Sequence, residues 1–174
     1  MKNKILSDFD LNHRKFEDFR SKLEIILADL LQLNLIKVHQ VTSRVKDRNS
    51  LESKIDLKDK YSDLHQITDL VGLRVITYLE SDVDKVAEII KNEFLIDSAN
   101  SVDKRNLKSD QFGYRSLHYV MSLNELRSAL PEYRQFASIK AEIQIRSTLQ
   151  HVWVDIPDHV DPDRTNRRLN ICVC

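Results

Sequence analysis

Residues 138–146 carry the pattern that most constrains how this chain can fold. Apolar and polar side chains alternate there, with Ile139, Ala141, Ile143 and Ile145 between Lys140, Glu142, Gln144 and Arg146. Because successive side chains of a strand point to opposite faces, one face of this segment is apolar and the other holds an acid, an amide and a base. The pattern predicts a strand with one face in the core and the other available for a site.

The other apolar patterns predict helices and strands in mixed order. A helical stripe from Phe16 to Leu33 indicates one long helix. Further strands are expected at 36–45, 70–79 and 116–123, and a polar loop at 97–111. Further helices are expected after a cap at Asn49, after a cap at Ser81 with Phe94 as its last apolar residue, and from Ser147 to Pro157. We therefore expect an α/β (α+β) fold, a mixed β-sheet flanked by helices.

Composition excludes several classes of protein. Only two glycines occur, so the chain has no glycine-rich phosphate loop of the Walker or Rossmann type, and any phosphate site must be built from side chains. The 27 basic and 27 acidic side chains balance, which argues against binding nucleic acid through bulk charge. No apolar run reaches the roughly 18 residues of a membrane span, and the start lacks the apolar region of a signal peptide. We expect a cytoplasmic protein without a membrane partner.

Four residues near the end of the 36–45 strand could bind a polyphosphate. Arg44 and Lys46 share a strand face, and Ser50 and Lys54 are spaced to share a helix face. Three cations and a hydroxyl at a strand-to-helix turn can hold phosphates without a glycine loop. A solvated basic edge would show the same spacing.

Asp69 and Arg74 flank the start of the apolar 70–79 strand. An arginine inside such a strand is unusual unless it is paired or faces a ligand, and a structural salt bridge is the alternative. If Glu142 lies beside Asp69, the two carboxylates can hold Mg²⁺ together with substrate phosphates. A carboxylate near the metal can also accept a proton from an attacking hydroxyl.

The segment from Gly113 to His118 could present an aromatic ring to a base. Glycine permits a tight turn, which would expose Tyr114 as a stacking surface. A tyrosine that opens a strand is more often part of the core.

Together these segments resemble the synthetase domain of the RelA/SpoT family, the alarmone synthetases. The matching stretches are Arg44–Lys54, Asp69–Arg74, Gly113–His118 and Glu142–Trp153, in the family's order and approximate spacing. The resemblance divides the chain into an N-terminal helical segment (1–36), a synthetase domain (37–156) and an atypical tail (157–174). It implies a nucleotidyltransferase-like fold.

The resemblance also implies an activity, a Mg²⁺-dependent transfer of pyrophosphate from ATP to the ribose 3′-hydroxyl of GDP or GTP. Arg44 and Arg74 would sandwich the adenine, and Lys46, Ser50 and Lys54 would hold the ATP phosphates. Asp69 would bind Mg²⁺, and Glu142 would help to hold it and activate the hydroxyl. Tyr114 would stack on the guanine. The other acceptor-side residues would be His118, Gln144 and Arg146.

Two stretches depart from the family pattern. Asp110 is acidic where the family commonly has a lysine, which weakens the expected contacts to the acceptor's phosphates. After Trp153 the sequence departs from the family's. Pro157 would end a helix that the family extends, and Cys172 and Cys174 lie in a tail without a match. We interpret the two thiols as free, and the tail as a truncated, frame-shifted or artificially bounded end.

Two other functions fit the same sequence. A toxic member of the family would pyrophosphorylate the 3′ end of tRNA, using a basic patch drawn from Arg105, Lys108, Arg115, Arg127 and Arg134. A non-catalytic nucleotide-binding module is the other alternative, and the unusual tail is its only support. The sequence does not determine the oligomeric state.

Overall fold

The computed structural model describes residues 2–58, 61–104 and 116–150. The helices are α1 (Lys2–Leu33), α2 (Arg48–Lys58), α3 (Glu80–Glu93) and α4 (Glu125–Ser128), with short 3₁₀ turns at Leu64–Gln66 and Arg134–Phe136. The strands are β1 (Val38–Val45), β2 (Val71–Thr77), β3 (Phe94–Ile96), β4 (Val102–Asp103), β5 (Leu117–Leu123) and β6 (Ala141–Ser147).

The strands form one mixed sheet in the order β1-β2-β6-β5-β3, and β4 pairs with β5 outside this path. β2 and β6 run parallel at its centre, whereas the other pairs are antiparallel. The predicted fold, a mixed sheet flanked by helices, is confirmed. Among the helices that the structure describes, none is long and apolar enough to cross a membrane.

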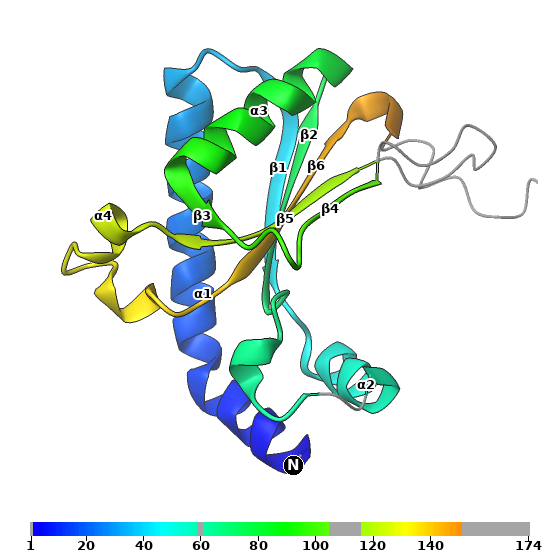
Figure 1. The fold of residues 1–174 in the computed structure, drawn as a ribbon, viewed down its shortest axis with the longest axis vertical. Coiled ribbons are helices and arrows are strands. Elements are labelled where there is room, and N and C mark those ends of the chain that lie inside the picture. Colours follow the sequence, from blue (N-terminus) through cyan, green and yellow to red (C-terminus); the bar gives the residue numbers. More distant parts are fainter. Residues whose placement is uncertain (1, 59–60, 105–115, 151–174) are drawn as a thin grey trace, which may run out of the picture.

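The two faces of the sheet differ in composition and in cover. Leu73, Val75, Ile143 and Ile145 lie on one face, in a single core with the buried side chains of α1 and α3. Both helices therefore cover this face, and Figure 1 shows them on the same side of the sheet. The opposite face carries the polar residues of β1, β2, β5 and β6, which leaves it available for a site.

Several predicted element ends are wrong, each for a local reason. The cap of α2 is Asp47, whose Oδ1 accepts hydrogen bonds from the backbone N–H groups of Asn49 and Ser50 at 2.9 and 3.1 Å. α3 already begins at Glu80, so Ser81 lies inside it. The predicted loop at 97–111 contains β4, which pairs with β5. Phe94 opens β3 instead of closing α3, because its extended backbone pairs with Leu123.

The helix expected after β6 does begin there. Ser147 and Gln150 form a reciprocal capping box, in which the Gln150 backbone N–H reaches Ser147 Oγ at 3.4 Å and Gln150 Oε1 accepts from the Ser147 N–H at 2.9 Å. The predicted end at Pro157 and the tail with Cys172 and Cys174 lie outside the described residues.

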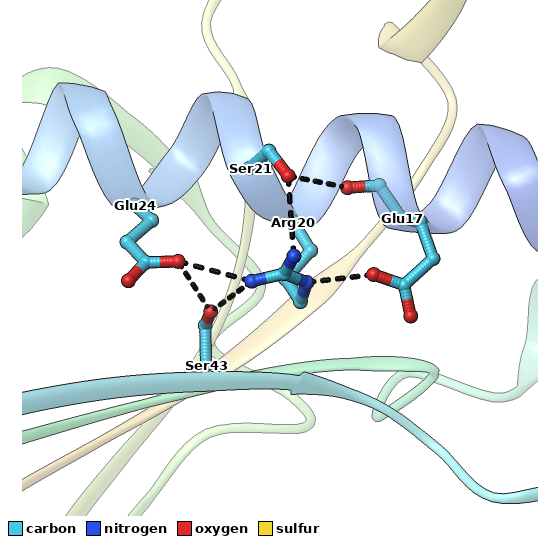
Figure 2. Close-up of polar contacts among 5 residues, drawn as sticks. All are labelled: Glu17, Arg20, Ser21, Glu24 and Ser43. Carbon is cyan, nitrogen blue, oxygen red and sulfur yellow. Dashed lines mark hydrogen bonds and ion pairs between the residues drawn. The ribbon is translucent and has the colours of Figure 1, made fainter.

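A polar cluster joins α1 to the edge strand β1 (Figure 2). Ser43 Oγ accepts a hydrogen bond from Arg20 at 2.8 Å and donates one to Glu24 at 2.8 Å, while Arg20 also binds Glu17 and Glu24. Because Ser43 points toward α1, its neighbours Thr42 and Arg44 point to the opposite face of the sheet. The cluster thereby determines that Thr42 and Arg44 lie on the polar face of the sheet.

We expect Arg20→Ala to lower the free energy of unfolding by about 1–2 kcal/mol, since it removes several partly buried charge-assisted hydrogen bonds. Arg48→Ala is the matched control, because the Arg48–Asp10 pair has both side chains 49% exposed and should contribute under about 1 kcal/mol. Urea denaturation of the two variants measures the difference. Equal losses would show that the cluster adds nothing beyond an exposed ion pair.

Candidate active site

The parallel pairing of β2 with β6 brings the predicted carboxylates to one end of the sheet. Gly72 pairs with Glu142 and Val71 with Ala141, so the strands begin side by side. Asp69 lies two residues before β2, and Glu142 is the second residue of β6. Residues far apart in sequence therefore meet at the same edge.

A pocket of about 350 Å³ opens on this polar face, and its wall includes most of the residues singled out on β1, β2 and β6. Thr42, Ser43, Arg44, Asp69, Gly72, Leu73, Arg74, Glu142 and Gln144 line it. Arg44, Gly72 and Glu142 are neighbours across three strands, and so are Thr42, Arg74 and Gln144. The alternation of β6 predicted this face, and the register of three strands assembles it.

A second pocket of about 560 Å³ lies against α2 and shares Asp69 with the first. Its wall includes Lys46, Ser50 and Lys54. The side chains of Lys46 and Lys54 are only 14% and 20% exposed, so these two cations are not part of a solvated basic edge. The structure therefore brings three of the four predicted polyphosphate residues into one hollow, while Arg44 lines the first pocket.

Asp69 is held between two lysines. Lys46 Nζ donates to Asp69 Oδ2 at 3.0 Å, and Lys54 Nζ lies 2.7 Å from Oδ1. Burial by itself raises the pKa of Asp69, but the contacts with Lys54 and Lys46 outweigh it, so the pKa lies below its ordinary value of 3.8. The Asp69 carboxylate is thus ionised at neutral pH. Within the described parts of the chain, no ion pair joins it to Arg74, which was the structural alternative.

Glu142 has a different set of neighbours. His118 Nδ1 lies 2.7 Å from Glu142 Oε1, and Gln144 Nε2 donates to the same oxygen at 3.4 Å. The contact with His118 is the main reason that the pKa of Glu142 lies below its ordinary value; burial and the charge of Asp69 act in the opposite direction. Two ionised carboxylates therefore share one pocket wall.

Among the residues that the structure describes, neither arginine of the pocket forms a hydrogen bond or ion pair through its side chain. Arg44 is exposed on β1. Arg74 Nε is buried and has no hydrogen-bond acceptor among the residues that the structure describes. A buried guanidinium donor without an acceptor is costly, and a ligand in the pocket would supply what is missing.

Not all of the predicted acceptor-side residues are found in the wall of a described pocket. Arg146 is only 2% exposed and is not in the wall of either pocket. His118 has both ring nitrogens engaged, with Ser116 Oγ and Glu142 Oε1, each at 2.7 Å. Tyr114 lies outside the described residues. The assignment of these three to the acceptor side stays a prediction.

Sequence reasoning missed several lining residues. Gly72 belongs to the Asp69–Arg74 stretch, and a glycine inside a strand often marks close approach by a ligand, which was the available signal. Asn49, Ser53 and Lys58 line the second pocket with Ser50 and Lys54. Asn49 and Ser53 are four residues apart, and Lys58 lies four residues after Lys54. A helical projection would therefore have placed them on the same face.

The two carboxylates suit a divalent cation whose remaining ligands come from water and from substrate phosphates. Asp69 and Glu142 supply oxygen donors, the kind that Mg²⁺ prefers. Within the parts of the chain that the structure describes, no group of three or more histidine, cysteine or acidic side chains is arranged to hold a metal by itself. A metal at this pocket would therefore depend on the bound phosphates as well.

The family model for the region found in RelA/SpoT proteins matches residues 43–161, more than half of the chain. This chain belongs to the RelA/SpoT family. The matched region contains the last three residues of β1, all of β2, β5 and β6, and all residues of both pockets except Thr42. A comparison with curated proteins gives no significant match.

Solved structures of the family share the fold. Small alarmone synthetase 2 from Bacillus subtilis is 24% identical, with a TM-score of 0.66 over 96% of this chain and 84% of that one. A GTP pyrophosphokinase family protein from Streptococcus pneumoniae is also 24% identical, with a TM-score of 0.67 over 94% and 76%.

Small alarmone synthetase 1 from Bacillus subtilis has been solved with two nucleotides. The structure bound to its product pppGpp is 20% identical, with a TM-score of 0.67 over 94% of this chain and 83% of that one. The structure bound to AMPCPP is 18% identical, with a TM-score of 0.60 over 97% and 82%. These likenesses establish the RelA/SpoT synthetase fold for this chain.

We expect Asp69→Asn to lower the free energy of unfolding by about 1–3 kcal/mol at pH 7, because it removes the charge that Lys46 and Lys54 contact. The folded pKa of Asp69 is below the unfolded one, so the stabilisation is complete above pH 3.8 and is lost as the pH falls through the folded value. Denaturation curves of both proteins at pH 7 and below pH 3.8 should show the difference shrinking. A difference that does not change with pH would contradict the assignment.

Proposed function

We propose that this protein transfers the β,γ-pyrophosphate of ATP to the ribose 3′-hydroxyl of GDP or GTP. The observation that carries the proposal is the pair of ionised carboxylates, Asp69 and Glu142, in one pocket wall beside a lysine-lined hollow. Phosphoryl transfer depends mainly on positioning and on neutralisation of charge, and this arrangement supplies both. We also expect the reaction to take place in the cytoplasm.

The ATP phosphates would lie in the hollow against α2. Lys46 and Lys54, which form ion pairs with Asp69 in this structure, would turn to the phosphates. Ser50 would donate a hydrogen bond to them. Arg44 and Arg74 would hold the adenine between their guanidinium planes, for which the register of β1 and β2 places them on one face. The pppGpp- and AMPCPP-bound structures of the Bacillus subtilis relative support nucleotides as ligands of this fold.

In the proposed step, one phosphorus–oxygen bond forms as another breaks. The 3′-oxygen attacks the β-phosphorus of ATP, and the bond from that phosphorus to the oxygen bridging the α- and β-phosphates breaks, which releases AMP. Glu142 takes the proton of the hydroxyl as its general base. The lowered pKa of Glu142 keeps it ionised at neutral pH and therefore able to accept that proton.

Mg²⁺ is part of the proposal, since Asp69 and Glu142 fit it. When bound, it would neutralise charge on the phosphates. Asp69 would hold it once Lys46 and Lys54 have moved to the phosphates, and Glu142 would contribute a second oxygen.

The test uses ATP labelled in its terminal phosphate, offered with GDP, GTP or deacylated tRNA. We expect label in GDP or GTP, and about 10²–10⁴-fold less for Glu142→Gln because its general base is lost. Glu132→Gln, at an exposed position away from both pockets, should match the wild type. Label in tRNA alone, no transfer by folded protein, or full activity of Glu142→Gln would each overturn the proposal.

Gly72 provides a second prediction, on the shape of the pocket. A methyl group added there would lie 3.8 Å from Arg44 Cγ, which is ordinary contact, so Gly72→Ala should bind AMPCPP within about threefold of the wild type. Gly72→Val adds a larger side chain to the pocket wall and should weaken binding about tenfold or more. Isothermal titration calorimetry compares the two variants. Equal affinities would show that no ligand approaches this part of the wall.

A further inference from the structure

Three side chains, of which Glu142 is the last, form a connected series. Ser116 Oγ lies 2.7 Å from His118 Nε2, and His118 Nδ1 lies 2.7 Å from Glu142 Oε1. Ser116 is buried at 2% exposure, and the His118 and Glu142 side chains are 13% and 23% exposed. The series thus runs from the protein interior to the wall of the pocket.

The antiparallel pairing of β5 with β6 sets this geometry. His118 pairs with Gln144, and Glu142 pairs with Val120, so His118 and Glu142 are diagonal neighbours on the same face. Diagonal neighbours are close enough for long side chains to touch. Gln144 also donates to Glu142 Oε1, at 3.4 Å.

Both contacts fall on the same oxygen. His118 and Gln144 bind Oε1 of Glu142, whereas among the described residues neither a hydrogen bond nor an ion pair involves Oε2. An ionised carboxylate only accepts hydrogen bonds, so the proton of the contact must be carried by His118 Nδ1. When Nε2 carries no proton, it can accept a hydrogen bond from the Ser116 hydroxyl, so both ring nitrogens have partners.

We propose that His118 is a positioning residue, which with Ser116 and Gln144 fixes Oε1 of Glu142 and leaves the two lone pairs of Oε2 for the reacting hydroxyl and for the metal. The proposal rests on the proposed function, because it assigns Glu142 the role of general base. The position of a catalytic group matters strongly, since a misplacement of about 1 Å can cost about 10²-fold in rate. His118 would act on kcat through Glu142, without contacting either nucleotide.

Substitutions of His118 separate this role from a contact with the acceptor. His118→Ala should lower kcat about 10²-fold while the KM values for ATP and for GDP stay within about threefold. In His118→Asn the amide nitrogen can take the place of Nδ1 and should restore kcat to within about tenfold of the wild type. His118→Gln is the matched control, because its amide reaches toward the Nε2 position and Ser116, and it should not restore kcat.

Three results would overturn the proposal. A large rise in the KM for GDP with little change in kcat would mean that His118 binds the acceptor. Equal activities of the asparagine and glutamine variants would mean that the contact with Glu142 is not what matters. Wild-type kcat in His118→Ala would mean that Glu142 needs no such support. Circular dichroism and AMPCPP binding establish that each variant is folded.

A measurement without turnover tests the geometry even if the proposed reaction is wrong. In ¹⁵N-histidine-labelled protein without nucleotide or metal, one of the six histidines should show its proton on Nδ1 and vanish in His118→Asn. Glu142→Gln and Ser116→Ala should each shift this signal. A neutral His118 ring with its proton on Nε2 would refute the positioning role. Inactive wild-type protein with the expected spectrum would instead refute only the proposed function.

Discussion

The parallel pairing of β2 with β6 is the constraint on which the site depends. It places Gly72 opposite Glu142 and so brings Asp69, just before β2, to the sheet end where β6 begins. A register shift of one residue would turn Glu142 and Gln144 into the core and Ile143 toward the pocket. The apolar residues that α1 and α3 cover therefore hold the polar face in place as well, since the same register serves both.

The cover of the sheet explains why one face remains open. α1 and α3 bury the apolar side, and the polar cluster of Arg20, Glu24 and Ser43 fixes the edge strand against α1. β1 pairs with β2 on one side only in the described sheet, so this cluster adds an anchor that the ladder alone does not give. Arg44, on the alternate face of β1, gains a defined direction from this cluster.

Both carboxylates of the pocket are kept ionised by neighbours that differ in kind. Two lysines contact Asp69, and the same lysines line the hollow suited to phosphates, so a polyphosphate would compete with Asp69 for them. A histidine and an amide contact Glu142 on one oxygen only. In the proposed reaction, Asp69 would therefore hold the cation once the lysines bind phosphate, whereas Glu142 would keep one fixed position.

The order of residues along the chain reveals which chemistry is available and on which faces of the strands it lies. Alternation along 138–146 separated Glu142 and Gln144 from the core, and the four matching stretches indicated the RelA/SpoT family, because both signals are local and periodic. The predicted helix caps at Asn49 and Ser81 were wrong, because in each case the helix is capped two residues earlier, at Asp47 and Leu79.

Which of these side chains meet depends on how the strands are ordered and packed in three dimensions. Strand order and register set the partners of Glu142, and neither can be read from one strand's pattern, because pairing joins residues distant in sequence. The same non-local packing left Arg146 buried although its alternation equals that of Glu142, and gave Asp69 two lysines in place of Arg74. Local periodicity determines a side chain's face, but its neighbours depend on the whole sheet.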